Sequence, residues 1–207
     1  MRELKGQLEA EEGVMIRVLL EADHVQVPTW VVDLESFRRW SDDEAFPETG
    51  LVSFLKGDVW IDMSKEQLFS HNQVKMAIAF VVMGLVRAGW KGRYFGDGVF
   101  LSHIEADLSN QPDGVLVSAA SLQEGRVRIV EGRAEGHVEL EGSPDLVLEV
   151  VSRSSVEKDT VVLRRAYAEA EVREYWLVDA RQESVRFKVL RLTRRGYTAS
   201  RKQAGWS

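Results

Sequence analysis

The stretch Leu146-Val-Leu-Glu-Val-Val151 decides the fold, because an apolar run of this length between turn signals predicts a strand buried on both faces. Ser154 or Ser155 follows and can cap a helix that runs to about Ala170. The segment Glu174-Tyr-Trp-Leu-Val-Asp179 predicts the next strand. A strand, a helix and a strand at this spacing imply a crossover connection and a parallel pair of strands.

A long helix is expected upstream of this unit. Ser64 and Gln67 have the spacing of a capping box, and the helix that they open ends at Gly89. Its apolar run from Met76 to Val86 is well short of the ~20 residues that span a bilayer. We therefore expect a buried helix and not a membrane anchor.

Strands are expected along much of the remaining chain. Residues 14–33 are rich in β-branched side chains and can hold one or two strands, after which Asp33 caps a short helix that carries Phe37 and Trp40. The other strands are expected in a hairpin at 51–63 around Gly57, at 92–103, at 114–118, in a hairpin formed by 126–130 and 137–140, and in a closing hairpin formed by 185–192 and 197–200.

Composition limits the class of protein. The chain has 207 residues and no cysteine, which excludes disulfides, thiolate zinc sites and thiol catalysis and fits a reducing cytoplasm. The segment Met1–Glu9 carries acids and no apolar core, so it does not predict a signal peptide. We expect a cytoplasmic protein in which residues 35–207 form one domain and residues 1–34 form an N-terminal extension.

Charge is distributed unevenly along the chain. Residues 181–207 contain eight Lys or Arg residues against Glu183, a net charge of +7 in a chain whose total is −6. A basic outer strand that prevents edge-to-edge aggregation is the commoner meaning of such a pattern. A phosphate-bearing partner near the C-terminus is the alternative.

Several common catalytic motifs are absent. The sequence contains no Walker phosphate loop, no dinucleotide-binding glycine motif, no serine nucleophile elbow and no HExxH zinc motif. The four histidines are too scattered to predict a multi-histidine metal site: His24, His71, His103 and His137. Oxygen ligands are what remains.

Glu149 is the most informative residue, because it places a carboxylate inside an apolar strand. Burying such a charge is costly unless it is compensated by a divalent cation shared with a second carboxylate, or by an arginine such as Arg164 or Arg165. Asp145 shares its face but lies roughly 13 Å away, and we expect it to end a loop by accepting backbone hydrogen bonds. Asp113, before a neighbouring strand, is the better partner, although its Pro-Asp-Gly step is also ordinary turn chemistry.

Two carboxylates from adjacent strands supply the hard oxygen ligands that Mg²⁺ prefers, and they leave positions open for water and a phosphate oxygen. Such a site can activate water and stabilise the pentacoordinate phosphoryl state. A nearby lysine would normally help to orient or deprotonate that water.

The residues around Glu149 resemble a known family. The matching segments are Pro144-Asp-Leu-Val-Leu-Glu-Val-Val-Ser152, Asp159 with Tyr167 eight residues later, and Val172-Arg-Glu-Tyr-Trp-Leu-Val-Asp179. They are similar to the putative restriction endonuclease family, a former domain of unknown function in the PD-(D/E)XK nuclease superfamily. The similarity also includes Gly57, His71 and Pro112-Asp113, and it covers about residues 35–192.

The resemblance implies an α/β (α+β) fold, with a restriction-endonuclease-like mixed β-sheet flanked by helices. It also implies that Asp113 and Glu149 are the metal-binding acids. Three positions depart from the pattern: Leu163 stands where family members commonly carry a lysine, Val151 where the superfamily places one, and Ser53 where an acid is usual.

Other residues can replace the missing groups. Lys158, Arg164 or Lys75 can supply the cation, and Glu66 can supply the acid. We take Lys158 as the catalytic candidate, although its place near the start of the second helix favours a side chain that faces solvent. His71 can face the cleft, but a solvated or hydrogen-bonded helix position is commoner. Tyr175 and Trp176 are expected in the core.

The first hypothesis is a metal-dependent DNA endonuclease that uses Mg²⁺ or Mn²⁺ and a water nucleophile. The second is a catalytically impaired nuclease-like module that binds nucleic acid or a protein partner. A third is an oligomeric scaffold that uses the basic hairpin at 185–200. A homodimer suits the first hypothesis, because two sites cut both strands of a duplex more easily than one.

Overall fold

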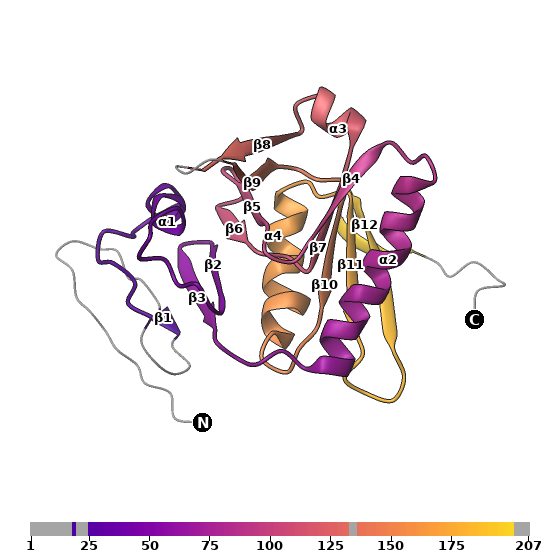
Figure 1. Cartoon of the computed structure of the whole chain (residues 1–207), viewed down its shortest axis with the longest axis horizontal. Helices are drawn as coiled ribbons and strands as arrows, with labels where there is room; N and C mark the ends of the chain where they lie inside the picture. Colours follow the sequence, from indigo (N-terminus) through magenta and orange to yellow (C-terminus); the bar gives the residue numbers. More distant parts are fainter. Residues whose placement is uncertain (1–17, 20–24, 133–135, 201–207) are drawn as a thin grey trace.

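The computed structural model describes residues 18–19, 25–132 and 136–200, and the chain folds into two mixed β-sheets with helices against them (Figure 1). The first sheet has seven strands, in the spatial order β1 (Val18–Leu19), β3 (Asp58–Asp62), β2 (Leu51–Leu55), β6 (Leu108–Asn110), β5 (Phe100–His103), β9 (His137–Gly142) and β8 (Val127–Glu131). The second sheet has six, in the order β13 (Gly196–Ala199), β12 (Arg186–Thr193), β11 (Glu174–Asp179), β10 (Leu146–Val150), β7 (Gly114–Ser118) and β4 (Gly92–Gly96). The expected mixed sheet flanked by helices is therefore present as two sheets.

The predicted crossover unit is confirmed. β10 and β11 pair in parallel, with Glu149 opposite Leu177, and the chain between them forms one helix. That helix begins with a π-helical turn, η2 (Lys158–Val162), and continues as α4 (Leu163–Glu169). The expected cap at Ser154 or Ser155 is wrong, because the side-chain acceptor before the helix is Oγ of Ser152, to which the backbone N–H of Ser155 donates at 3.0 Å.

The predicted hairpins and the first helix are also confirmed. β2 and β3 pair antiparallel around Lys56 and Gly57, which both have positive φ. β8 pairs with β9, and β12 pairs with β13. Helix α1 (Leu34–Ser41) begins after Asp33, whose Oδ1 accepts from the backbone N–H of Ser36 at 2.8 Å. The expectation of strands in residues 14–33 is met by β1 within the described part, and the rest of that expectation lies largely outside it.

The expectation of one continuous strand at 92–103 is wrong. It divides into β4 and β5, which belong to different sheets. The break falls at Gly96-Asp97-Gly98, where Gly98 has a φ of +86° that a side chain would strain. The short strand β6, which follows β5 and ends at Asn110, was not expected from the sequence.

The expected start of the long helix is also wrong. Ser64 does not cap it: the helix begins with a π-helical turn, η1 (Leu68–Asn72), and continues as α2 (Gln73–Arg87). The side chain of Gln67 provides the cap, because its Oε1 accepts from the backbone N–H of Phe69 at 2.7 Å. The predicted end is confirmed, since Gly89 follows the helix with a φ of +117°.

Helices α2 and α4 lie on opposite faces of the second sheet (Figure 1). The face toward α4 holds the main core, in which Val147 and Tyr175 pack against Leu163 and Tyr167. The face toward α2 holds a smaller cluster around Leu148. Tyr175 is fully buried as predicted, and Trp176 packs at the edge of the smaller cluster.

The expectation that the long helix is buried is wrong. Of α2, only Lys75 and Val82 are buried. Residues 68–87 are long and apolar enough to cross a membrane by length and composition alone, with 11% of that window buried. However, Val74 and Ile78 pack on the second sheet, which ties the helix to the rest of the fold.

Candidate metal and acid cluster

The two predicted metal-binding acids come from adjacent strands. β7 pairs antiparallel with β10, so that Gly114 lies opposite Leu148. Asp113 directly precedes β7, and its Oδ2 accepts from the backbone N–H of Val150 at 2.6 Å. This bond places the carboxyl group of Asp113 next to the strand residue that follows Glu149.

Glu149 lies in the main core and is held by neutral donors, not by an arginine. Its Oε1 accepts from the hydroxyl of Tyr167 at 2.6 Å and from Nδ2 of Asn110 at 3.1 Å. Within the described residues, Oε2 accepts no hydrogen bond, and the residue is 4% exposed. The arginine alternative is wrong for Arg164, which donates to the carbonyl of Tyr197 at 3.1 Å.

Three buried carboxyl groups share this region and influence one another. Burial raises the pKa of Glu149 well above its usual range, and the nearby charges of Asp159 and Asp113 raise it further. Burial also raises the pKa of Asp113, against the opposing effect of His71. For Asp159, burial raises the pKa to about 6, although Lys158 and Ser155 act in the other direction. Such a group of carboxylates favours a compensating cation.

Lys158 supplies positive charge inside this cluster. Its side chain is buried, at 9% exposure, and its Nζ lies 3.4 Å from Oδ1 of Asn110. Its charge lowers the pKa of both Glu149 and Asp159. The expectation that Lys158 faces solvent is therefore wrong, and its side chain lies among the candidate site residues.

The positions that depart from the family pattern hold no charge. Leu163 and Val151 are both buried in the main core. The hydroxyl of Ser53 donates to Oδ1 of Asn110 at 2.7 Å. Asn110 therefore contacts Ser53, Lys158 and Glu149, and it links the first sheet to the second. Sequence reasoning missed Asn110, because the short strand β6 gave no pattern from which its burial could be inferred.

A second basic group, Lys75, lies at the other side of Asp113. Its Nζ is 2.6 Å from Oδ2 of Asp97 and 3.5 Å from Oδ1 of Asp113, and it also pairs with Glu66. Burial opposes its charge, but the bonds to Asp97 and Glu66 outweigh burial and raise the pKa of Lys75. Burial likewise opposes the charge of Glu66, yet the hydrogen bond from Lys75 contributes most to lowering the pKa of Glu66 to about 2.

His71 also faces the acids. Its Nδ1 lies 2.7 Å from Oε1 of Glu66, and its Nε2 lies 3.6 Å from Oδ2 of Asp113. Of the two expected positions, solvated or hydrogen-bonded, the hydrogen-bonded one is present, and His71 also lies near Asp113. The expectation for Asp145 is confirmed: its Oδ2 accepts from the backbone N–H of Ser118 at 2.6 Å, and it pairs with Arg173.

Tyr94 of β4 was also missed. Its hydroxyl is buried with no hydrogen-bond partner among the described residues. A Cβ atom at Gly114 would lie 2.1 Å from that hydroxyl, so only glycine fits beside this ring. The nearest signal in the sequence was the glycine of the Pro-Asp-Gly step, which we interpreted as turn chemistry.

The donor set fits a hard divalent cation. The described residues contain no group of three or more His, Asp or Glu side chains arranged to hold one ion. Mg²⁺ does not need one, because it is commonly bound by one or two carboxylates and keeps several waters. Asp113 and Glu149 would provide the two carboxylates, and Oδ1 of Asp159 is a buried carboxylate oxygen with no hydrogen-bond partner in the part of the chain that the structure describes.

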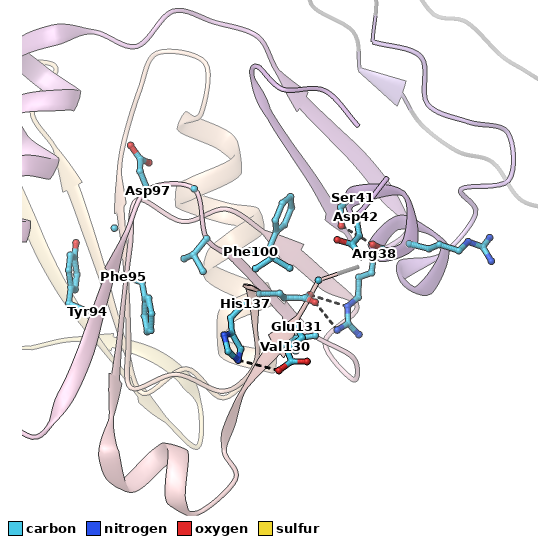
Figure 2. A pocket seen from close by; sticks show the side chains of 17 residues that line it. Arg38, Ser41, Asp42, Tyr94, Phe95, Asp97, Phe100, Val130, Glu131 and His137 are labelled. Atoms are coloured by element: carbon cyan, nitrogen blue, oxygen red, sulfur yellow. Dashed lines mark hydrogen bonds and ion pairs between the residues drawn. The ribbon is translucent and has the colours of Figure 1, made fainter. Parts of the chain in front are cut away.

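A separate cleft of about 950 Å³ lies between α1, the β4–β5 loop and the β8–β9 hairpin. Figure 2 shows that Arg38 and His137 in this cleft each pair with a carboxylate. Asp97 lines the cleft and also binds Lys75, so the cleft adjoins the acid cluster. The metal-binding candidates themselves do not line it.

Within residues 181–200, the basic C-terminal segment forms an edge of the second sheet, because β13 is the outermost strand there, while Arg201 and Lys202 lie outside the described residues. Arg181 and Arg191 pair with acids on β11. The remaining basic residues of this hairpin are exposed: Arg186, Lys188, Arg194 and Arg195. Arg186 and Lys188 lie on β12 and the other two in the turn after it, so the outermost strand β13 carries no basic residue. The protective role and the phosphate-binding alternative both stay predictions.

Comparison with known proteins identifies the class. The model of the Uma2 family, described as "Putative restriction endonuclease", matches residues 34–206, and the chain belongs to this family. In a solved structure with the same fold, described as a putative nuclease belonging to DUF820 from Anabaena variabilis, the match covers 81% of this chain and 83% of that one. The sequence identity is 17% and the TM-score is 0.58. A comparison with curated protein sequences finds no match.

Proposed function

We propose that the chain is a metal-dependent endonuclease that hydrolyses phosphodiester bonds in DNA, with Mg²⁺ or Mn²⁺ held by Asp113 and Glu149. The observation that carries this proposal is the pair of buried carboxyl groups on adjacent strands, each with a raised pKa and no arginine partner among the described residues. Lys75 and His71 beside Asp113 and Lys158 near Glu149 supply part of the compensation, and a divalent ion would supply more. Family membership supports the nuclease class.

The surrounding side chains would orient the ligands. Tyr167 and Asn110 both donate to Oε1 of Glu149, which fixes the carboxyl group and leaves Oε2 for the ion. The backbone N–H of Val150 fixes Asp113 through Oδ2, which leaves Oδ1 with Lys75 as its neighbour. Bound Mg²⁺ would supply Lewis acidity toward the phosphoryl group and lower the pKa of water.

Lys158 would provide the positive charge that the family usually places elsewhere. From its buried position beside Asn110, its ammonium group can stabilise the charge that develops on the phosphoryl group, or orient the attacking water. In this proposal Lys158, one residue before Asp159, replaces the lysine that family members commonly carry at the position of Leu163, four residues after Asp159.

A plasmid-nicking assay tests the proposal. The purified protein should nick supercoiled DNA with Mg²⁺ or Mn²⁺ and not with a chelator. Glu149→Gln should abolish nicking, because it removes a ligand charge. The variant should still fold, because the raised pKa of Glu149 means that burial disfavours the ionised form that glutamine replaces. Glu174→Gln, on the neighbouring strand and outside the cluster, is the matched control.

The same assay tests Lys158. Lys158→Met should slow nicking on the order of 100-fold, as expected for the loss of one preorganised charge. Lys91→Met, at an exposed lysine outside the cluster, should leave the rate unchanged.

Equal nicking by wild type and Glu149→Gln would reject the assignment of the site.

The second candidate function is a nuclease-like module that binds nucleic acid or protein without cutting. The apolar residues at both expected lysine positions, Val151 and Leu163, favour it. Calorimetric titration distinguishes the two functions. Salt-dependent DNA binding without binding of a divalent ion at millimolar concentration would support the module.

A further inference from the structure

The outer side of the long helix is an apolar surface that the rest of the described chain leaves uncovered. Seven large apolar residues on η1 and α2 are between 51% and 81% exposed. They are Leu68, Phe69, Met76, Phe80, Val81, Met83 and Leu85. No charged residue lies between Lys75 and Arg87. A helix that is apolar on all sides is normally buried on all sides.

The area of this surface is that of an interface and not of an ordinary exposed patch. A large side chain offers on the order of 150 to 200 Å² when fully exposed, so these seven residues present roughly 800 Å². The largest apolar patch on a monomer is usually about 300 to 600 Å². One partner in a stable interface contributes about 800 Å².

A groove runs beside this helix on the same face of the second sheet. Its volume is about 410 Å³, and apolar side chains of α2, the turn after it, β7, β10 and β11 form most of its lining, beside the charged Asp145, Arg173 and Glu174. They include Val82, Leu85, Val86, Trp90, Leu116 and Trp176. Leu85 belongs both to the exposed residues and to the lining, so the exposed surface of α2 continues into this largely apolar groove.

A second copy of the chain is the occupant that this arrangement fits. In a two-fold contact each copy presents the same patch, so a ridge adjacent to a groove is complementary to itself. The α2 surface between Lys75 and Arg87 carries no charged residue, so a contact through it removes no charged side chain of the helix from water.

A membrane is the weaker fit. Helices that lie in a membrane interface carry lysines and arginines on their polar face. On the inner side of α2 the one lysine, Lys75, is bound to Glu66 and Asp97, so its charge is not available to lipid headgroups. A spanning orientation would also break these bonds and remove Val74 and Ile78 from the sheet.

We propose that the chain forms a two-fold dimer in which α2 of each copy packs its exposed apolar row against α2 and the adjoining groove of the other. This inference does not rest on nuclease activity. It accounts for an apolar helix that would otherwise remain largely in water.

Measurement of mass in solution tests the proposal. Sedimentation of the full chain should give twice the 23.5 kDa mass of one chain at micromolar concentrations. Phe80→Glu and Gly84→Glu should each give the mass of one chain. Gly84 suits this test because a Cβ atom there meets nothing within 4 Å and glycine is a poor helix former, so the single chain should tolerate the change. Ile104→Glu, at an exposed residue on a distant turn, is the matched control and should remain dimeric.

Circular dichroism and thermal unfolding should show that both α2 variants stay folded, which separates loss of the contact from loss of the fold. A wild-type chain that is monomeric at every concentration from low micromolar upward would overturn the proposal. So would a dimer that persists in both α2 variants. Flotation of the wild type, but not of Phe80→Glu, with vesicles of phosphatidylcholine and phosphatidylglycerol would assign the surface to a membrane instead.

Discussion

Asp159 has a buried carboxyl group whose Oδ1 has no hydrogen-bond partner within the described residues, while its Oδ2 accepts from Ser155. Burial raises its pKa from 3.8 to about 6 in the folded chain. The folded state therefore holds this proton more tightly than the unfolded state. Protonation of Asp159 therefore stabilises the folded state. This stabilisation has its full value below the pKa of Asp159 in the unfolded chain, and it is lost as the pH rises through about 6.

Asp159→Asn should remove this dependence on pH. The free energy of unfolding of the variant minus that of wild type should increase by on the order of 2 kcal/mol as the pH rises from about 4 to about 8. Any cost of burying the amide is the same at both values, so the change in the difference is the quantity to measure, by urea unfolding. A difference that is constant with pH would show that Asp159 titrates normally.

At the scale of single residues, the sequence predicted the acids better than the groups that hold them. Glu149 was identifiable because a charge interrupts an apolar strand, and Asp113 because it precedes the neighbouring strand. Asn110 and Lys158 were not placed correctly, because their side chains reach the site only through the meeting of two sheets. No local pattern records such a long-range contact.

At the scale of elements, local turn chemistry predicted hairpins well and sheet membership poorly. The β2–β3 turn and the crossover after β10 follow from nearby residues. The division of 92–103 between two sheets does not follow from nearby residues. The segments before and after the glycine turn both have strand propensity, and that propensity does not depend on which sheet a segment joins.

Gly142 at the end of β9 is an element-scale test. It has a φ of +118°, and a Cβ atom there would lie 2.1 Å from the carbonyl oxygen of Arg126. That oxygen is fixed by the backbone N–H of Ser143 at 2.8 Å. Gly142→Ala should therefore lower the free energy of unfolding by about 2 kcal/mol more than Gly125→Ala, whose φ is also positive but whose Cβ meets nothing. Equal losses in urea unfolding would mean that strain in φ, and not the clash, sets the cost.

At the scale of the whole molecule, the long helix joins the two proposals. Its first turns carry His71 and Lys75, which face Asp113, and its outer side carries the apolar surface. The sequence predicted burial of this helix from its composition, and that requirement is met by the described chain only on the inner side. Composition states that an apolar surface must be covered, but it does not state whether the same chain covers it.

The pairing of two sites should be visible in the products of DNA cleavage. A dimer can cut both strands of a duplex in one encounter, whereas a single chain makes independent nicks that yield linear plasmid only when two fall close together. Wild type should therefore produce linear plasmid while little nicked circle has accumulated. Phe80→Glu should accumulate nicked circle first and linear plasmid late, with Ile104→Glu behaving as wild type. Gel analysis at equal total nicking measures this ratio, and the same ratio for wild type and Phe80→Glu would mean that the two strands are cut by chains acting independently of the α2 contact.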